Sequence, residues 1–295
     1  MSRPAKYCDL GANWFTGCEP GLPCWERCWA RAMANRLKGR YGYPADEPFR
    51  PTFHEAALAK PLPRKPAVIA LNFMGDWALA SRDRITDMLA MMSTYPQHTF
   101  LTLTKRPHLF TNKMVSIYPD NVWLGTSAST QAELDARLPA LLAIPAAHYW
   151  VSLEPILGPV DLRCVAAARV ADGRWGVDYL DTEYQHVDWV AVGCESGPRA
   201  RWGRRGQCWC ADGGGLVCPQ DDCCDDEPAC DVCEYEVNGW TRSVVAQCRA
   251  AGVPVWVKQV PVLRDGASRV SDDPEAFPED LRVQERPFPK GGRER

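Results

Sequence analysis

The chain has 295 residues, of which 46% are hydrophobic and 24% charged, and its formal net charge at pH 7 is -3. This composition excludes an intrinsically disordered chain, and so small a net charge says little about binding partners. No stretch approaches about 20 apolar residues, and residues 1–17 lack the apolar core of a signal peptide. We therefore expect a cytoplasmic protein without a membrane segment.

The first motif along the chain is a group of three cysteines in TGCEPGLPCWERCWA, where Cys18, Cys24 and Cys28 follow a C-x5-C-x3-C pattern. Fourteen cysteines in a cytoplasmic chain favour metal ligation over disulfides. A closed structural zinc site needs four ligands, whereas three ligands leave a coordination position open for chemistry. The alternative is a structural zinc site that Cys8 or His54 completes.

Strand and helix patterns alternate after this motif. Continuous apolar runs rich in Val, Trp and Leu predict six buried parallel strands, at 67–76, 98–107, 121–129, 148–159, 187–198 and 253–261. A seventh strand, short and weak, is expected at 13–16. Helical patterns occur at 24–40, 81–96, 130–145 and 241–252, and Pro139 is expected to start or kink a second helix within the third. The alternation predicts an α/β fold, a partial or full (β/α) barrel of about six to seven parallel strands.

This pattern also suggests how the chain is divided. Residues 1–202 and 238–271 are expected to form one βα-barrel domain. A small Cys-rich, metal-binding insertion interrupts it at 203–237. The tail at 272–295 is rich in Pro, Asp, Glu and Arg, and we expect it to be extended or disordered.

Polar residues stand at or just after almost every predicted strand end. Because βα loops at the carboxyl ends of barrel strands build the functional site, these residues are the candidates for it. Buried carboxylates and a lysine there need one another, a metal or a ligand, so the alternatives are a salt-bridged ring and a polar site. The candidates are Asn72, Asp76, Lys105, Arg106, Ser127, Glu154, Glu195, Lys258 and Gln259.

A second group of seven cysteines lies within 208–233, in a segment with almost no apolar residues. Because such a segment cannot fold around a core of its own, bound metal is the expected source of its order. Zinc on four of the seven is the first interpretation; an auxiliary iron–sulfur cluster and a disulfide-prone loop are the alternatives. The candidate ligands are Cys208, Cys210, Cys218, Cys223, Cys224, Cys230 and Cys233.

Several motifs together carry a family resemblance. They are NWFTGC, CWERCW, LTKRP, WLGTS, VSLEPILGPVDL, VGCESGPRAR and CRAAGVPVWVKQ, which run in this order from residue 13 to residue 259. With them the chain resembles phage proteins of the gene-product thirty-seven/sixty-eight type, which carry a three-cysteine motif. That family is similar to radical S-adenosylmethionine (SAM) enzymes. The resemblance implies a radical-SAM-like barrel with a [4Fe–4S] cluster on Cys18, Cys24 and Cys28.

The resemblance also implies a reaction and roles for the strand-end residues. An electron donor would reduce the cluster, and SAM would be cleaved to a 5′-deoxyadenosyl radical that abstracts hydrogen from a substrate. Asn72 and Asp76 match the position that holds the SAM amine, and Lys105 is expected to bind its carboxylate. Ser127 and Glu154 are expected to bind its ribose or adenine.

The remaining candidates, Glu195, Lys258 and Gln259, would then face the substrate as catalytic residues. The phage context suggests a nucleobase, nucleotide or nucleic acid as that substrate, and the host cytoplasm as the location. Cys194 stands where the family more often has glycine, and packing is its expected role.

A second hypothesis is a zinc-stabilised nucleic-acid- or protein-binding protein on a βα barrel without redox activity. The C-x5-C-x3-C spacing supports it, because radical SAM enzymes usually show C-x3-C-x2-C. A metal-dependent hydrolase is disfavoured, since none of the five histidines stands in an H-x-H or H-E-x-x-H pattern.

Overall fold

The computed structural model describes residues 6–111, 118–163, 178–181, 186–196, 231–264 and 267–288. Its strands are β1 (Leu10–Ala12), β2 (Phe15–Thr16), β3 (Thr52–Phe53), β4 (Val68–Leu71), β5 (Thr99–Thr104), β6 (Val122–Ser127), β7 (His148–Leu153), β8 (Trp189–Gly193), β9 (Val255–Arg264) and β10 (Ala267–Ser271). Its α-helices are α1 (Trp29–Arg36), α2 (Glu55–Leu58), α3 (Arg82–Ser93), α4 (His108–Thr111), α5 (Gln131–Leu142) and α6 (Asp231–Ala251). Its 3-10 turns are η1 (Trp25–Arg27), η2 (Trp77–Leu79), η4 (Pro274–Ala276) and η5 (Glu279–Leu281).

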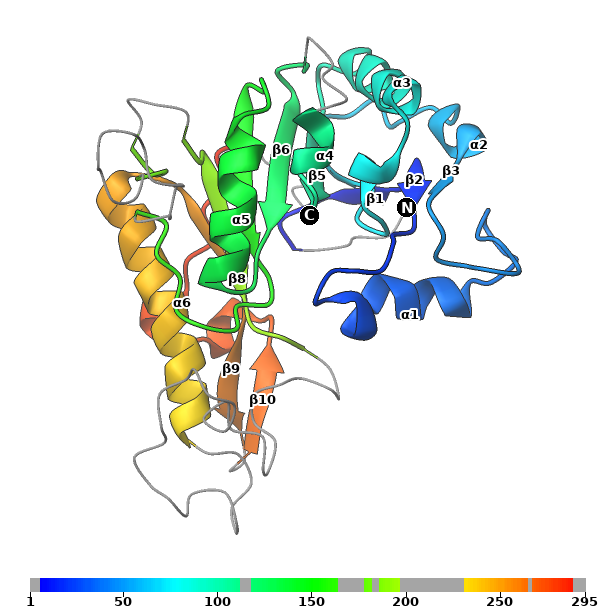
Figure 1. Cartoon of the computed structure of the whole chain (residues 1–295). Coiled ribbons are helices and arrows are strands. Elements are labelled where there is room, and N and C mark those ends of the chain that lie inside the picture. The colour runs from blue at the N-terminus through cyan, green and yellow to red at the C-terminus, as the bar shows by residue number, and fades with distance from the viewer. Residues whose placement is uncertain are drawn as a thin grey trace. The chain divides into compact units, whose positions relative to one another are not determined.

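The fold is mixed α/β, built on one eight-stranded sheet of order β1-β4-β5-β6-β7-β8-β9-β10 (Figure 1). The pairs β1–β4, β4–β5, β5–β6 and β8–β9 are parallel, and only β10 is shown to pair antiparallel, with β9. The predicted α/β fold with a mostly parallel sheet is therefore confirmed. Within the described residues the order begins at β1 and ends at β10, so the sheet is open and the full-barrel alternative was wrong.

The six apolar runs correspond to β4 through β9. Every residue of β4, β6 and β8 is buried, which explains why their sequences are continuously apolar rather than alternating. Of the weak strand expected at 13–16, only Phe15–Thr16 forms a strand, which is β2. β1 extends the large sheet, whereas β2 pairs with β3 in a separate two-stranded sheet.

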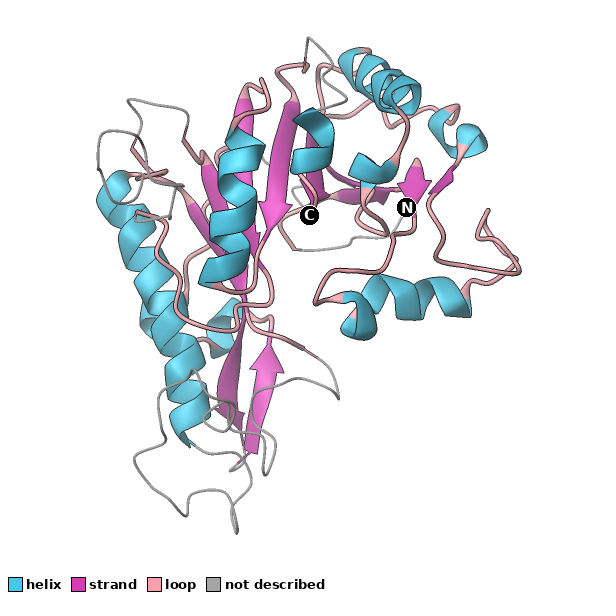
Figure 2. Ribbon diagram, in the orientation of Figure 1, coloured by secondary structure: helices cyan, strands magenta, loops and turns pink. Residues whose placement is uncertain are grey.

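The four predicted helices correspond to α1, α3, α5 and α6, and Figure 2 shows the helices in cyan. In α3 the side chains spaced for one face, Ile85, Met88, Leu89 and Met92, are buried, and the Ser81 hydroxyl accepts the Arg84 N–H as a cap. Helix α5 runs through Pro139, so this proline does not start a second helix. Helix α6 begins at Asp231, ten residues before the predicted start at 241.

The chain divides into two compact units. The first comprises 1–127, 136–150 and 288–295, and the second comprises 128–135 and 151–287. The three-cysteine motif and the ends of β4 to β6 belong to the first unit. The residues that follow β7 and β8 belong to the second, together with β9, β10 and α6, which packs on β8 and β9.

The part of the tail that the structure describes, to residue 288, contains η4 and η5. It buries four apolar side chains, Phe277, Leu281, Val283 and Phe288. The Cys-rich insertion expected at 203–237 lies outside the described residues up to 230. No helix in the described part of the chain is long and apolar enough to cross a bilayer.

Candidate functional site

The cysteine motif begins at a glycine that brings two backbone segments together. Gly17 donates its N–H to the Met74 carbonyl at 3.1 Å, and its own carbonyl accepts the Asp76 N–H at 2.9 Å. Its φ is +89°, and a Cβ at this position would lie 2.1 Å from the Arg50 oxygen. Only glycine fits so close an approach, which places Cys18 beside the loop that follows β4.

The other two cysteines of the motif flank one 3-10 turn. Cys24 precedes η1, and Cys28 ends it while serving as the N-cap of α1, where its carbonyl accepts the Ala32 N–H. All three cysteines are partly exposed free thiols. Cys18 and Cys28 pack against one buried cluster, formed by Ala30, Ala34, Tyr43, Phe49 and Met74. The motif therefore presents three sulfur donors on one short segment.

Charged neighbours act on Cys18 in opposite directions. Burial and the Asp76 carboxylate raise the pKa of the Cys18 thiol to about 11, and the Arg106 guanidinium opposes them. Arg106 is held nearby because its Nη2 donates to the Glu19 carbonyl at 2.8 Å and the Pro20 carbonyl at 3.0 Å. Cys18 is therefore a neutral thiol near pH 7, and binding a metal would require it to lose its proton.

Asp76 is the buried carboxylate behind this motif, with 5% of its surface exposed. Its Oδ1 accepts the Thr104 hydroxyl at 2.6 Å and the Ala78 N–H at 3.3 Å, and its Oδ2 accepts the Lys105 N–H at 3.0 Å. Burial raises the pKa of Asp76, while these hydrogen bonds lower it. Asp76 thus ties the end of β4 to the end of β5.

Asn72 comes first after β4 and is almost fully buried. Its Oδ1 accepts the N–H groups of Trp14 and Phe15 at 2.8 and 2.9 Å, and its Nδ2 contacts the sulfur of Met88 at 3.3 Å. The side chain therefore holds the segment that leads from β1 to Cys18.

The remaining candidates of the first unit follow β5 and β6. Lys105 is half-buried and follows β5 directly, and its backbone N–H is the donor to Asp76. Ser127 is the last residue of β6 and is buried; its carbonyl accepts a hydrogen bond from Arg137 Nη1 at 2.6 Å. The structure thus brings Asp76 and Lys105 together and gives Ser127 a separate partner.

The second unit gathers the other predicted residues. Lys258 Nζ lies 3.0 Å from Glu154 Oε2, and Gln259 Nε2 donates to the Cys194 carbonyl at 2.6 Å. Both Lys258 and Gln259 lie inside β9 rather than at its end, because the strand continues to Arg264. The register with β8 shifts between Val192 and Gly193, and such a bulge redirects the side chains around it.

Cys194 and Glu195 lie next to this ion pair. Cys194 is buried, and burial raises the pKa of its thiol while the charge of Lys258 lowers it. Glu195 and Glu154 act on the same thiol through their negative charges. This unit therefore contains a compact group of a lysine, two carboxylates and a thiol.

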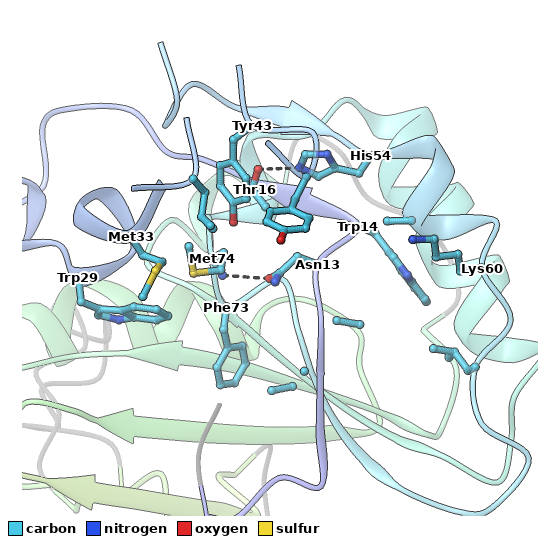
Figure 3. A pocket seen from close by; sticks show the side chains of 17 residues that line it. Asn13, Trp14, Thr16, Trp29, Met33, Tyr43, His54, Lys60, Phe73 and Met74 are labelled. Carbon is cyan, nitrogen blue, oxygen red and sulfur yellow. Dashed lines mark hydrogen bonds between the residues drawn. The ribbon is translucent and has the colours of Figure 1, made fainter. Parts of the chain in front are cut away.

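A cavity of about 590 Å³ opens beside the cysteine motif in the first unit (Figure 3). Trp29, which follows Cys28 directly, lines it, and so does Met74 from the cluster that supports Cys18 and Cys28. His54 lines it as well, and its Nε2 is 2.7 Å from the Thr16 hydroxyl. Strand-end reasoning missed this cavity, although the aromatic sequence YGY at 41–43 and the tryptophan after Cys28 could have indicated it.

The described residues bear differently on each of the predicted metal sites. Among the described residues, no group of three or more His, Cys, Asp or Glu side chains stands ready to hold a metal ion. Cys8, an alternative fourth ligand, is fully buried. Of the second cysteine group, residues 208–230 lie outside the described structure, as does the side chain of Cys233 within α6.

The first unit thus combines the strands β1 to β6, a three-cysteine loop and an adjoining cavity. The chain belongs to the family described as "Protein of unknown function (DUF5131)", which matches residues 3–211. The match includes the cysteine loop, the cavity and Glu154, and it ends before α6 and β9. No curated protein and no solved structure matches the chain.

Proposed function

We propose that this protein is a radical-SAM-type iron–sulfur enzyme, with a [4Fe–4S] cluster on Cys18, Cys24 and Cys28 and SAM as its cofactor. The observation that carries the proposal is a segment with three partly exposed free thiols, followed directly by Trp29, which lines a cavity. Three thiolates hold a cluster and leave one iron open to a further ligand. When bound, the cluster and SAM would supply one-electron chemistry for abstracting a hydrogen atom from a substrate.

The donor chemistry fits this group, although the thiols are not arranged as a finished metal site. Metal sites commonly form as the metal binds, since ligand deprotonation and local folding accompany binding. Arg106 supports this step because its positive charge favours the thiolate of Cys18. Gly17 and Asn72 hold the backbone on the amino side of Cys18.

The residues that follow β4 and β5 would position the cofactor. The Lys105 backbone N–H donates to Asp76, so the two residues lie at adjoining strand ends, where they would bind the SAM carboxylate and amine. In the second unit Glu195, Lys258 and Gln259 remain the candidates for contact with substrate. The Glu154–Lys258 pair keeps both charges partnered before any ligand binds.

Anaerobic reconstitution tests the proposal. The full chain is incubated with iron and sulfide, its iron and sulfide are counted, and 5′-deoxyadenosine is measured after adding SAM and dithionite. We expect about four irons on the motif and SAM cleavage without added substrate. Cys18→Ala, Cys24→Ala and Cys28→Ala should each abolish both signals, and a wild-type protein that binds no iron overturns the proposal.

One further variant separates this proposal from its alternative. A structural zinc site completed by Cys8 would lose its metal in Cys8→Ala, whereas a cluster on the three-cysteine loop would keep its iron. Zinc in place of iron after anaerobic purification, lost in Cys8→Ala, would favour the zinc-stabilised binding protein.

A further inference from the structure

The cavity beside the cysteine loop collects the exposed large hydrophobic side chains of the described structure. Three such side chains are exposed, namely Trp29 at 60%, Met33 at 37% and Tyr41 at 82%. All three line this one cavity. Exposed apolar groups that gather around one hollow mark a binding surface more often than exposed groups scattered singly.

The lining of the cavity suits a planar ligand. It includes small residues on two paired strands, Gly11 and Ala12 of β1 and Ala70 of β4. The aromatic residues that line it come both before the cysteine loop, at Trp14, and after it, at Trp29. A volume of about 590 Å³ lies within the range of ligand sites, roughly 300–1,000 Å³.

Tyr41 adds a conformational observation. Its φ is +54°, in the left-handed region that bulky residues rarely adopt. Such strain persists where the surrounding structure imposes it, and it is concentrated at functional sites. Here it holds an exposed phenol ring at the cavity rather than against the core.

Neutral polar groups line the wall of the cavity. Burial lowers the pKa of His54 and raises the pKa of the Tyr43 phenol, so both are uncharged near pH 7. Asn13 accepts the Met74 N–H through its Oδ1 at 3.2 Å. These groups can exchange hydrogen bonds with the polar edge of a base without requiring a charge on it.

Lys60 is the one lysine or arginine among the described residues that line the cavity. Figure 3 shows Lys60 and Trp29 at opposite ends of the cavity, with Asn13, Thr16 and His54 between them. Lys60 is exposed, and among the described residues it has no ion-pair partner. A ligand that spans the cavity would therefore meet aromatic rings at one end and positive charge at the other.

We propose that this cavity binds a nucleotide, with the base stacked on Trp29 and the phosphate next to Lys60. The nucleotide can be free or one unit of a single strand, because both present the same base and phosphate. As a binding site the cavity stands on its own observations. As a nucleotide site next to the proposed cluster, it rests on the proposed function.

Isothermal titration calorimetry on the full chain tests this site with AMP, GMP, CMP and UMP, with adenosine, and with an eight-residue oligothymidylate. We expect at least one nucleotide to bind with a Kd below about 1 mM, a weak but specific affinity. Trp29→Ala should weaken binding about tenfold or more, as loss of one base stack does, and Trp29→Phe should restore most of it. Tighter binding of the oligonucleotide than of any mononucleotide would show that the ligand is one unit of a single strand rather than a free nucleotide.

The role of Lys60 in binding the phosphate is tested with a matched control variant. Lys60→Gln should weaken nucleotide binding about five- to tenfold and leave adenosine binding unchanged, because only the nucleotide has a phosphate. Lys38→Gln removes another exposed lysine, which does not line the cavity, and it should alter the binding of neither ligand. Equal loss of adenosine and nucleotide in Lys60→Gln would overturn the assignment of the phosphate.

Two outcomes overturn the inference as a whole. One is the absence of nucleotide binding by the folded wild-type protein. The other is competition by SAM for the same site, which would assign the cavity to the proposed cofactor. Iron counted on the same samples keeps the two proposals apart: nucleotide binding without iron retains the cavity assignment and removes the proposed chemistry.

Discussion

A single asparagine determines the course of the backbone before the cysteine loop. Asn72 accepts two buried N–H groups through one oxygen while its own φ is +62°. Asparagine tolerates the left-handed region because its short polar side chain bonds locally, and alanine does not. The residue therefore contributes both hydrogen bonds and backbone conformation.

Two substitutions separate these contributions. Asn72→Gly keeps the conformation and loses the acceptor, so it should lower the free energy of unfolding by about 2–3 kcal/mol through two unpaired buried donors. Asn72→Ala should cost about 1 kcal/mol more, because it adds backbone strain. Urea denaturation followed by circular dichroism measures both, and equal values for the two variants would exclude the conformational contribution.

A buried histidine makes the fold sensitive to acid. His98 is almost fully buried, stacks on Tyr95 with ring centroids 5.7 Å apart, and packs edge-on against Phe100. Burial lowers its pKa below the ordinary 6.5. As the pH falls below 6.5 the unfolded chain takes up this proton before the folded one, so the free energy of unfolding decreases.

His98→Phe should reduce this acid sensitivity while keeping the aromatic packing. The measurement is the midpoint of thermal unfolding between pH 7.5 and pH 5, for wild type and variant. The unfolding midpoint of the variant should fall less across this range than that of the wild type. It should still fall to some extent, because burial also lowers the pKa of His54. Parallel curves would show that His98 does not carry the effect.

At the scale of elements, a junction between β2 and the loop after β4 fixes the cysteine motif. Gly17 and Gly75 form a parallel bridge, and a Cβ on Gly75 would lie 2.5 Å from the Gly17 backbone nitrogen. Gly17→Ala should therefore cost more than about 3 kcal/mol, because left-handed strain and overlap with backbone atoms add together. It should also reduce iron uptake by the reconstituted protein.

Gly21 provides the control. It has a φ of +101° but nothing within 4 Å of its Cβ position, so Gly21→Ala carries the strain without the overlap. Gly21→Ala should lower the free energy of unfolding by only about 1–2 kcal/mol, and iron uptake should be retained. Similar losses in both variants would show that the close contact at Gly17 is unimportant, and urea denaturation with an iron assay decides.

The burial of each strand explains which strands could be predicted from the sequence. The strands β4, β6 and β8 were predictable because burial on both faces makes each a continuous apolar run. The hairpin to β10 was missed because ASRVS is polar, although Asp265-Gly266 between β9 and β10 is a strong hairpin signal. The bulge at Gly193 cannot be read from periodicity; there Lys258 lies between Val257, which pairs with Val192, and Gln259, which pairs with Gly193.

The candidate site was predictable to a different degree. Cysteine spacing identified the loop, since ligand types at short spacing are visible without a fold. The cavity was not predictable, because its floor at β1 and its walls at Tyr41 and His54 meet only through long-range contacts. Small residues such as Gly11 and Ala70 carry no signal until the strands pair.

For the whole molecule, the two cysteine groups predict two separate metals. The first group lies beside the cavity and is proposed to hold iron, whereas the second, at 208–233, has the composition of a zinc-stabilised segment. Because the two groups share no ligand, each metal should respond only to its own cysteines. A structural zinc should also support folding, so its removal should lower the unfolding temperature.

Metal counts on three proteins test this independence. Wild type prepared anaerobically should hold about four irons and one zinc per chain by mass spectrometry of the elements. Cys230→Ser combined with Cys233→Ser should lose the zinc, keep the iron and unfold at a lower temperature, because a structural metal contributes folding energy. Cys24→Ser should lose the iron and keep the zinc. Loss of both metals in either variant would mean that one site depends on the other, and the division into a chemical and a structural metal would then fail.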